Sequence, residues 1–418
     1  MQRRLTHNVL WVLAERGVQT VAGIGIAAML ARALGVEGFG LFQYAQSLVL
    51  IGAAATLVCG AEVTVPRLVA LPAADSHQPL LRHVFVLRLA AALLAYMGLL
   101  VAVFWLSDSS ILRATVAILG ISILLREPFG TVIAWLQAQT DNRPAAVIAM
   151  AALLAKLLLV GALYTGGVRT LPAYACVLAL ESLLVAACLA GLYVRRTRGM
   201  PPLGHTLDRT MLQTLLHDGA LFWLAMLLMM AARRVDQLML KPAVPLAELG
   251  AYAASMQLLD NLLLLATVMV NALAPLLIYA QADRTIAIRR VAQLAGGMAL
   301  LGLAGGAVLA LLAPWVVHLL YGAAFSDAAA LLRLVALGSA LLFADAALTL
   351  LAVMLRRPVW IVGKWLAVLV ATVAIDSLLI PAFGARGAAI GYLCANACAV
   401  AVGVALLVRV WRSREHLA

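Results

Sequence analysis

The residues of this chain that could do chemistry are carboxylate and hydroxyl side chains set inside long apolar runs. Asp236 lies near the end of one run, and Thr372 and Asp376 lie four residues apart in another. Four residues make about one helical turn, so Thr372 and Asp376 share a helix face. Two carboxylates and a hydroxyl are hard oxygen donors suited to a small cation such as Na⁺, and neighbouring carboxylates can instead share a proton. The sequence therefore predicts a cation-coupling site made of Asp236, Thr372 and Asp376.

A second interpretation of Asp236 is an ordinary ion pair. Arg233 lies three residues earlier on the same helix, with Arg234 beside it. Residues three apart are neighbours on a helix surface, so Arg233 can reach the Asp236 carboxylate. The spacing alone leaves the ion pair and the cation site both open.

Other ionisable residues lie near the middle of their apolar runs, where an unpaired charge is costly. Arg126, Glu127, Lys156 and Glu181 belong to three consecutive runs at similar depth. Because paired charges cost far less than single ones, we expect these four to pair with one another. Asp345 lies at similar depth in a later run and has no partner that the sequence assigns.

A further layer of charges lies about two helical turns from the basic ends of the runs. Glu15, Arg16, Glu62 and Arg88 share this depth. They form either a network of ion pairs or, for the arginines, a binding site for an anion. Lys364 lies near a run end, and we expect its long side chain to snorkel to the membrane surface.

The elements that position these residues are membrane-spanning helices. Hydrophobic residues make up 65% of the chain and charged residues only 11%, which excludes an ordinary soluble domain. Each apolar run has roughly 20 residues or more, enough to cross about 30 Å of hydrocarbon as a helix and too long for a barrel strand. We expect an all-α membrane protein with about twelve transmembrane helices. The predicted spans are 8–31, 41–70, 80–106, 111–139, 145–166, 171–195, 213–240, 248–280, 288–320, 328–355, 359–381 and 386–410.

Lysine and arginine are concentrated in every second gap between the spans. These gaps and the span ends beside them hold 17 of the 30 basic residues, and the intervening gaps with their span ends hold only Arg32, Arg113, Arg169, Lys241 and Arg386. This asymmetry places both termini in the cytoplasm. The net charge of +12 comes from all the connecting segments and span ends together, so it indicates contact with anionic lipid and no nucleic-acid partner. The basic residues of the alternate gaps are Arg3, Arg4, Arg67, Arg82, Arg143, Arg195, Arg196, Arg198, Arg209, Arg284, Arg289, Arg290, Arg356, Arg357, Arg409, Arg412 and Arg414.

The chain divides into two similar halves. We predict an N-lobe at 1–195, a cytoplasmic connector at 196–212 and a C-lobe at 213–418. Gly40 and Gly250, in matching connectors, are 210 residues apart, and Arg-Pro pairs at 143–144 and 357–358 open the fifth and eleventh spans. Six spans return the chain to its starting side, so the two six-helix lobes are expected to be parallel repeats related by a pseudo-two-fold axis along the membrane normal.

Three short stretches resemble a known family. Ala31–Gly35 (ARALG) with Phe39–Gly40 (FG) is similar to the run after that family's first helix. Gly250–Ala254 (GAYAA) is similar to the start of its eighth helix, and Tyr321–Ala328 (YGAAFSDA) to the start of its tenth. The family is the oligosaccharide flippases of polysaccharide and O-antigen biosynthesis. It belongs to the multidrug/oligosaccharidyl-lipid/polysaccharide exporter superfamily, together with lipid II flippases and multidrug exporters.

The resemblance implies a function. It is the transfer of a polyprenyl-diphosphate-linked oligosaccharide, as in O-antigen lipopolysaccharide assembly, from the cytoplasmic to the periplasmic leaflet of a bacterial inner membrane by alternating access. Na⁺ or H⁺ is the candidate coupling ion, no cofactor is expected, and a polysaccharide polymerase and a chain-length regulator are candidate partners. The alternative is a cation-coupled multidrug exporter of the same superfamily. No nucleotide loop, metal cluster or activated nucleophile is present in the sequence, so we do not expect an enzyme.

The resemblance also suggests which charges meet the substrate. The family's first and eighth helices line its cavity, which favours Arg16 for the diphosphate and draws attention to Asp260. Arginine forks suit an anionic diphosphate. The candidate substrate-binding residues are Arg16, Arg88, Arg126, Arg233, Arg234 and Asp260. The family's lipid II flippase branch has a sodium site on helices seven and eleven that resembles the group Asp236, Thr372 and Asp376.

Overall fold

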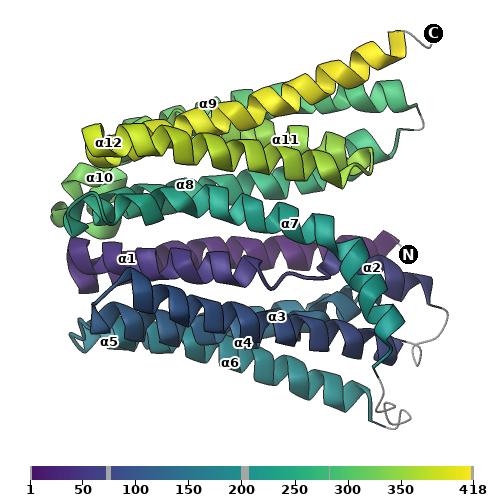
Figure 1. Cartoon of the computed structure of the whole chain (residues 1–418), viewed down its shortest axis with the longest axis horizontal. Helices are drawn as coiled ribbons and strands as arrows, with labels where there is room; N and C mark the ends of the chain where they lie inside the picture. The colour runs from purple at the N-terminus through teal and green to yellow at the C-terminus, as the bar shows by residue number, and fades with distance from the viewer. Residues whose placement is uncertain (1, 72–76, 199–206, 282, 416–418) are drawn as a thin grey trace. The chain divides into compact units, whose positions relative to one another are not determined.

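The protein is helical throughout the part that the structure describes (Figure 1). This computed structural model describes residues 2–71, 77–198, 207–281 and 283–415, without the side chains of 2–16, 276 and 413–415. No strand occurs among these residues, which confirms the all-α fold. The helices are α1 (Gln2–Ala54), α2 (Ala61–Ala70), α3 (His77–Leu106), α4 (Ser110–Ala138), α5 (Arg143–Thr165), α6 (Leu171–Arg196), α7 (Arg209–Leu240), α8 (Leu246–Ala274) with a π-helical end η2 (Pro275–Tyr279), α9 (Arg284–Tyr321), a 3₁₀ turn η3 (Ala323–Phe325), α10 (Ser326–Ala336), α11 (Ser339–Met354) and α12 (Pro358–Glu415).

The membrane-spanning segments match the predicted set in number. Nine described helices are long and apolar enough to cross a membrane, and ten when the bent pair α10 and α11 counts as one span. The helices α1 and α12 each contain a glycine with positive φ, Gly35 at 69° and Gly384 at 57°. These glycines mark kinks that divide each long helix into two segments. Counting both segments of each brings the described spans to the expected twelve.

The second predicted span is not one continuous helix. We expected a helix over 41–70, but α1 ends at Ala54 and α2 begins only at Ala61. Carbonyls freed by this break find partners elsewhere: Trp223 Nε1 donates to the Ala55 carbonyl at 2.8 Å, and Arg88 Nη2 to the Cys59 carbonyl at 2.9 Å. Irregular backbone at membrane depth is tolerated where protein groups satisfy it in this way. The break therefore depends on α3 and α7.

Contacts divide the chain into two compact units. The first comprises Met1–Leu34 and Ala45–Leu227, and the second comprises Gly35–Tyr44 and Leu228–Ala418. The short segment after the Gly35 kink thus packs with the second unit, although it lies early in the sequence. The predicted division into moving lobes at 1–195 and 213–418 stays a prediction.

The repeat-related glycines Gly40 and Gly250 touch within the second unit. A Cβ atom placed on Gly40 would lie 2.7 Å from the Gly250 nitrogen, and one on Gly250 would collide with the Val36 carbonyl. Both positions therefore require glycine, because a side chain would push two backbones apart. Positions that correspond in the two halves of the sequence thus meet at one close helix contact.

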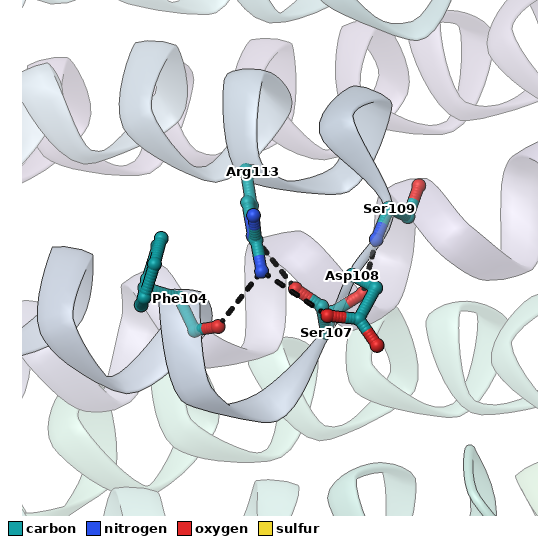
Figure 2. A network of polar contacts seen from close by, with 5 residues as sticks. All are labelled: Phe104, Ser107, Asp108, Ser109 and Arg113. Carbon is teal, nitrogen blue, oxygen red and sulfur yellow. Dashed lines mark hydrogen bonds and ion pairs between the residues drawn. The ribbon is translucent and has the colours of Figure 1, made fainter.

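The hairpin between α3 and α4 is closed by Arg113 (Figure 2). Its Nε donates to the Ser107 carbonyl at 2.7 Å, and its Nη2 donates to the Phe104 carbonyl at 3.0 Å and pairs with Asp108 at 3.4 Å. The guanidinium also lies 4.4 Å from the centre of the Phe104 ring. A cation is favourable at a helix C-terminus, where carbonyls lack partners. Arg113, which belongs to a connector predicted to face outward, therefore caps the carbonyls at the C-terminal end of α3.

Candidate functional site

The Asp236 carboxylate is held by two hydrogen-bond donors in the second unit. Asp236 lies on α7 and is 2% exposed. The Tyr252 hydroxyl on α8 donates to its Oδ2 at 2.5 Å, and the Gln237 amide donates to its Oδ1 at 2.7 Å. Hydrogen bonds to a charged acceptor are the stronger class. Both oxygens of Asp236 are therefore satisfied although the residue is buried in a membrane-spanning helix.

Asp376 has the opposite environment. It lies on α12 with no exposed surface, and within the described residues neither carboxylate oxygen has a hydrogen-bond partner. Its carboxylate fills the space beside Gly391, where a Cβ would collide with Oδ1. Its electrostatic neighbour is the like charge of Asp236. A buried carboxylate without a partner is costly, so this site calls for a proton or a cation.

A small cavity borders the Asp236 carboxylate. It encloses about 20 Å³, and Asp236, Arg233 and Thr372 are among the residues that line it. About 10–15 Å³ measured in this way suffices for one water molecule, so the cavity suits a species of that size. The Thr372 hydroxyl is buried and donates to the Val368 carbonyl at 2.8 Å, which leaves its oxygen free to accept.

These residues fit a small hard cation by their chemistry. The structure brings Asp236 and Thr372 to one cavity and places Asp376 within electrostatic reach of Asp236. Carboxylate and hydroxyl oxygens are the donors that such an ion takes. The orphaned oxygens of Asp376 supply negative charge that nothing described in the chain balances. The predicted trio thus forms one neighbourhood, and its role in coupling stays a prediction.

The two arginines on α7 do not pair with Asp236 in the described contacts. Arg234 forms an ion pair with Asp260 on α8 at 2.8 Å. The Arg233 guanidinium lies 5.5 Å from the centre of the Trp365 ring, a cation–π arrangement. The spacing of Arg233 and Asp236 allowed an ion pair that the structure does not contain. Sequence reasoning also gave Tyr252 no role, because its bond to Asp236 joins two helices whose facing sides a single sequence does not show.

The candidate substrate-binding arginines of the first unit lie in different settings. Arg88 is 4% exposed, and its Nη2 and Nη1 donate to the carbonyls of Cys59 and Glu127 at 2.9 and 3.2 Å. Its guanidinium is thus engaged with backbone. Arg126 is exposed on α4. The side chain of Arg16, the leading candidate, lies outside the described residues.

Two further ion pairs stabilise the units. Lys156 on α5 pairs with Glu181 on α6 at 3.0 Å, which confirms the expected pairing of these two residues. The expectation that Lys364 snorkels is wrong. Its ammonium is buried and bonds both oxygens of Asp345 at 2.9 and 3.0 Å and the Thr349 hydroxyl at 2.8 Å. Asp345, for which the sequence assigned no partner, keeps the Lys364 side chain in the protein interior, because the two opposite charges compensate each other.

The fold of this chain is similar to that of several solved membrane transporters. Among curated protein sequences, none matches the chain. Similar solved structures include an inward-facing MATE multidrug resistance transporter of the MOP superfamily, 16% identical, with a TM-score of 0.69 over 98% of this chain and 96% of that one. Another is the lipid II flippase MurJ in an inward closed conformation, 11% identical, with a TM-score of 0.74 over 96% and 87%. A third is a MOP superfamily transporter from Pyrococcus furiosus, 16% identical, with a TM-score of 0.65 over 97% and 95%.

These likenesses establish the fold, which is that of the MOP superfamily. The family is established by the sequence itself, since residues 5–281 match the polysaccharide biosynthesis protein family. That match covers more than half of the 418 residues. It includes the first two of the three stretches on which the resemblance was based. The chain belongs to the polysaccharide biosynthesis protein family.

Proposed function

We propose that this protein is a flippase for a polyprenyl-diphosphate-linked oligosaccharide. It moves the glycan from the cytoplasmic to the periplasmic leaflet of a bacterial inner membrane by alternating access. The observation that carries the proposal is the combination, in one chain, of a polysaccharide biosynthesis sequence and the fold of MOP superfamily transporters. A membrane-embedded member of such a family meets its glycan as a lipid-linked intermediate. Both termini lie in the cytoplasm, and a polymerase and a chain-length regulator are the partners that act on the product.

Coupling to a cation follows from the Asp236–Asp376 neighbourhood. A bound Na⁺ or a proton would supply the positive charge that the Asp376 carboxylate lacks. Asp236 is fixed by Tyr252 and Gln237, and Thr372 offers a neutral oxygen from the same cavity. Because α7 and α12 both contribute, occupancy of the site changes how these two helices attract each other. That is the kind of differential interaction that can shift a conformational equilibrium.

The diphosphate end of the substrate requires basic groups. Arg16 is the first choice, because the resembling family lines its cavity with helix one. Arg233 borders the small cavity and makes only a cation–π contact among its described interactions. Arg234 is held by Asp260, and a doubly charged diphosphate is a stronger bidentate partner for a guanidinium than one carboxylate. Arg88 and Arg126 remain candidates of lower rank on geometry, the first because backbone carbonyls occupy it.

The test is transport in proteoliposomes that contain the purified chain and a polyprenyl-diphosphate oligosaccharide. A membrane-impermeant glycosidase reports which glycans have reached the outer leaflet. We expect protein-dependent transfer that an imposed Na⁺ or pH gradient accelerates, and we expect Arg16→Ala to lose it while the protein is still inserted. Uptake of organic cations with no glycan transfer would instead identify the multidrug exporter alternative.

A further inference from the structure

Tyr252 bonds an aspartate, Asp236, that has two arginines close to it in the α7 sequence. Asp236 shares its helix with Arg233 and Arg234, yet its two hydrogen-bond donors are Tyr252 and the Gln237 amide. Arg234 is close enough to interact electrostatically with Asp236. Its Nε is buried and has no hydrogen-bond partner among the described residues. Arg234 therefore has a donor to spare among its described contacts and interacts with Asp236 through its charge, yet it makes no described hydrogen bond to the carboxylate.

We infer that Tyr252 is a positioning residue that keeps the Asp236 carboxylate turned away from Arg234 and available to a sodium ion at the neighbouring cavity. This inference rests on the proposed cation coupling and goes one step further, because it says why Asp236 is not neutralised by the arginines on its own helix. It also gives a role to the tyrosine of the Gly250–Ala254 stretch. That stretch resembles the family, but the resemblance does not say what its tyrosine does.

The geometry supports a positioning role for three reasons. Tyr252 is fully buried, and its hydroxyl reaches Oδ2 at 2.5 Å from a different helix. The Gln237 amide fixes the other oxygen, so the plane of the carboxylate is set by two donors. Tyr252 is neutral, so it orients the carboxylate without cancelling its charge. An arginine in the same place would cancel that charge and remove the attraction for a cation.

Loss of the hydroxyl should redirect Asp236. In Tyr252→Phe, the carboxylate loses a charge-assisted bond in a buried setting, and we expect Arg234, whose Nε has no partner among the described residues, to replace the hydroxyl as donor. The resulting ion pair removes Asp236 from the cation site. We expect the half-saturating Na⁺ concentration to rise about tenfold or more, since a factor of ten corresponds to about 1.4 kcal/mol, the low end for a hydrogen bond to a charged group.

The experiment measures thermal unfolding of the purified full chain in detergent across a NaCl series, with KCl holding ionic strength constant. Tyr321→Phe is the matched control, because Tyr321 is also buried, its described ring contacts are with Phe39 and Phe325, and its hydroxyl makes no hydrogen bond among the described contacts. We expect the sodium response to weaken in Tyr252→Phe and to match the parent in Tyr321→Phe. The double variant Tyr252→Phe/Arg234→Lys should recover sodium affinity, because lysine has a single ammonium, which the Asp260 carboxylate holds, and no second nitrogen donor that could reach Asp236 at the same time.

The outcomes separate the inference from the proposed function. A parent protein whose unfolding ignores sodium contradicts the sodium coupling and this inference together. A parent response that persists unchanged in Tyr252→Phe contradicts the inference alone. A response lost in Tyr252→Phe and not recovered by Arg234→Lys also overturns it, since capture by Arg234 would then not be the cause.

Discussion

Asp376→Asn is the substitution that most directly tests the cation site. It keeps the shape of the side chain and removes one negative charge from a position with no exposed surface and no described hydrogen-bond donor. An uncompensated charge left in a protein interior costs about 3–5 kcal/mol. A buried neutral amide without partners costs about 1–3 kcal/mol. In sodium-free buffer the variant should therefore be more stable than the parent, by about 2 kcal/mol from these ranges.

Sodium should reverse this order. A ligand present at 100 times its dissociation constant stabilises the folded protein by about 2.7 kcal/mol, and the parent should gain this while Asp376→Asn gains nothing. The assay is thermal unfolding in detergent with NaCl exchanged for KCl. Ser377→Ala is the control, because Ser377 is the exposed neighbour on the same helix and bonds only the Val373 carbonyl in its described contacts. A sodium response retained by Asp376→Asn, or a variant less stable than the parent in KCl, would refute the assignment.

Three other substitutions test parts of the fold. Lys364→Met leaves the buried Asp345 carboxylate without its partner and should destabilise the protein by about 3–5 kcal/mol, an effect that Lys364→Met/Asp345→Leu should largely remove in thermal unfolding. Gly250→Ala should sharply reduce the yield of folded protein by size-exclusion chromatography, because the added Cβ meets the Val36 carbonyl, whereas Gly296→Ala should be neutral since its Cβ meets nothing within 4 Å. Arg88→Met should loosen the break after α1, because the Cys59 carbonyl loses its guanidinium donor and keeps the Thr64 hydroxyl, and we expect faster hydrogen exchange of residues 55–60.

The spans were predictable because lipid imposes one simple rule on backbone groups and on apolar length. What the sequence did not indicate is where a span breaks. Nothing in the apolar pattern of 41–70 distinguishes a continuous helix from one interrupted after Ala54, since the interruption depends on donors from α3 and α7. The sequence also did not determine how deep in the membrane a charged group lies. We predicted the position of the Lys364 ammonium from its distance to a span end. In the structure, the position of Asp345 on α11 determines where the Lys364 ammonium lies.

The site shows the same division between what lies along a helix and what lies between helices. Thr372 and Asp376 could be assigned to one helix face because their spacing is local. The choice between an Arg233–Asp236 pair and a cation site could not be made, because it depends on a hydroxyl from α8. The sequence held a clue in the Gly250–Ala254 stretch, whose tyrosine had no explanation, but one chain gives no means of matching it to an aspartate sixteen positions earlier.

The stretches that resemble the family contribute mainly to helix packing, whereas the residues that could couple transport are buried polar groups. Phe39, Tyr321 and Phe325 form one aromatic cluster with ring centres 5.4–5.9 Å apart, and Gly40 packs on Gly250, so these stretches meet within the second unit as packing elements. Asp376 belongs to none of them. A relative could therefore keep the whole fold and exchange the residues of the predicted cation site, since among the described hydrogen bonds the Tyr252–Asp236 bond is the one that connects the two sets of residues. Similarity to MATE and MurJ structures accordingly establishes the fold alone. We expect any response of this chain to sodium to depend on the few buried oxygens on α7 and α12.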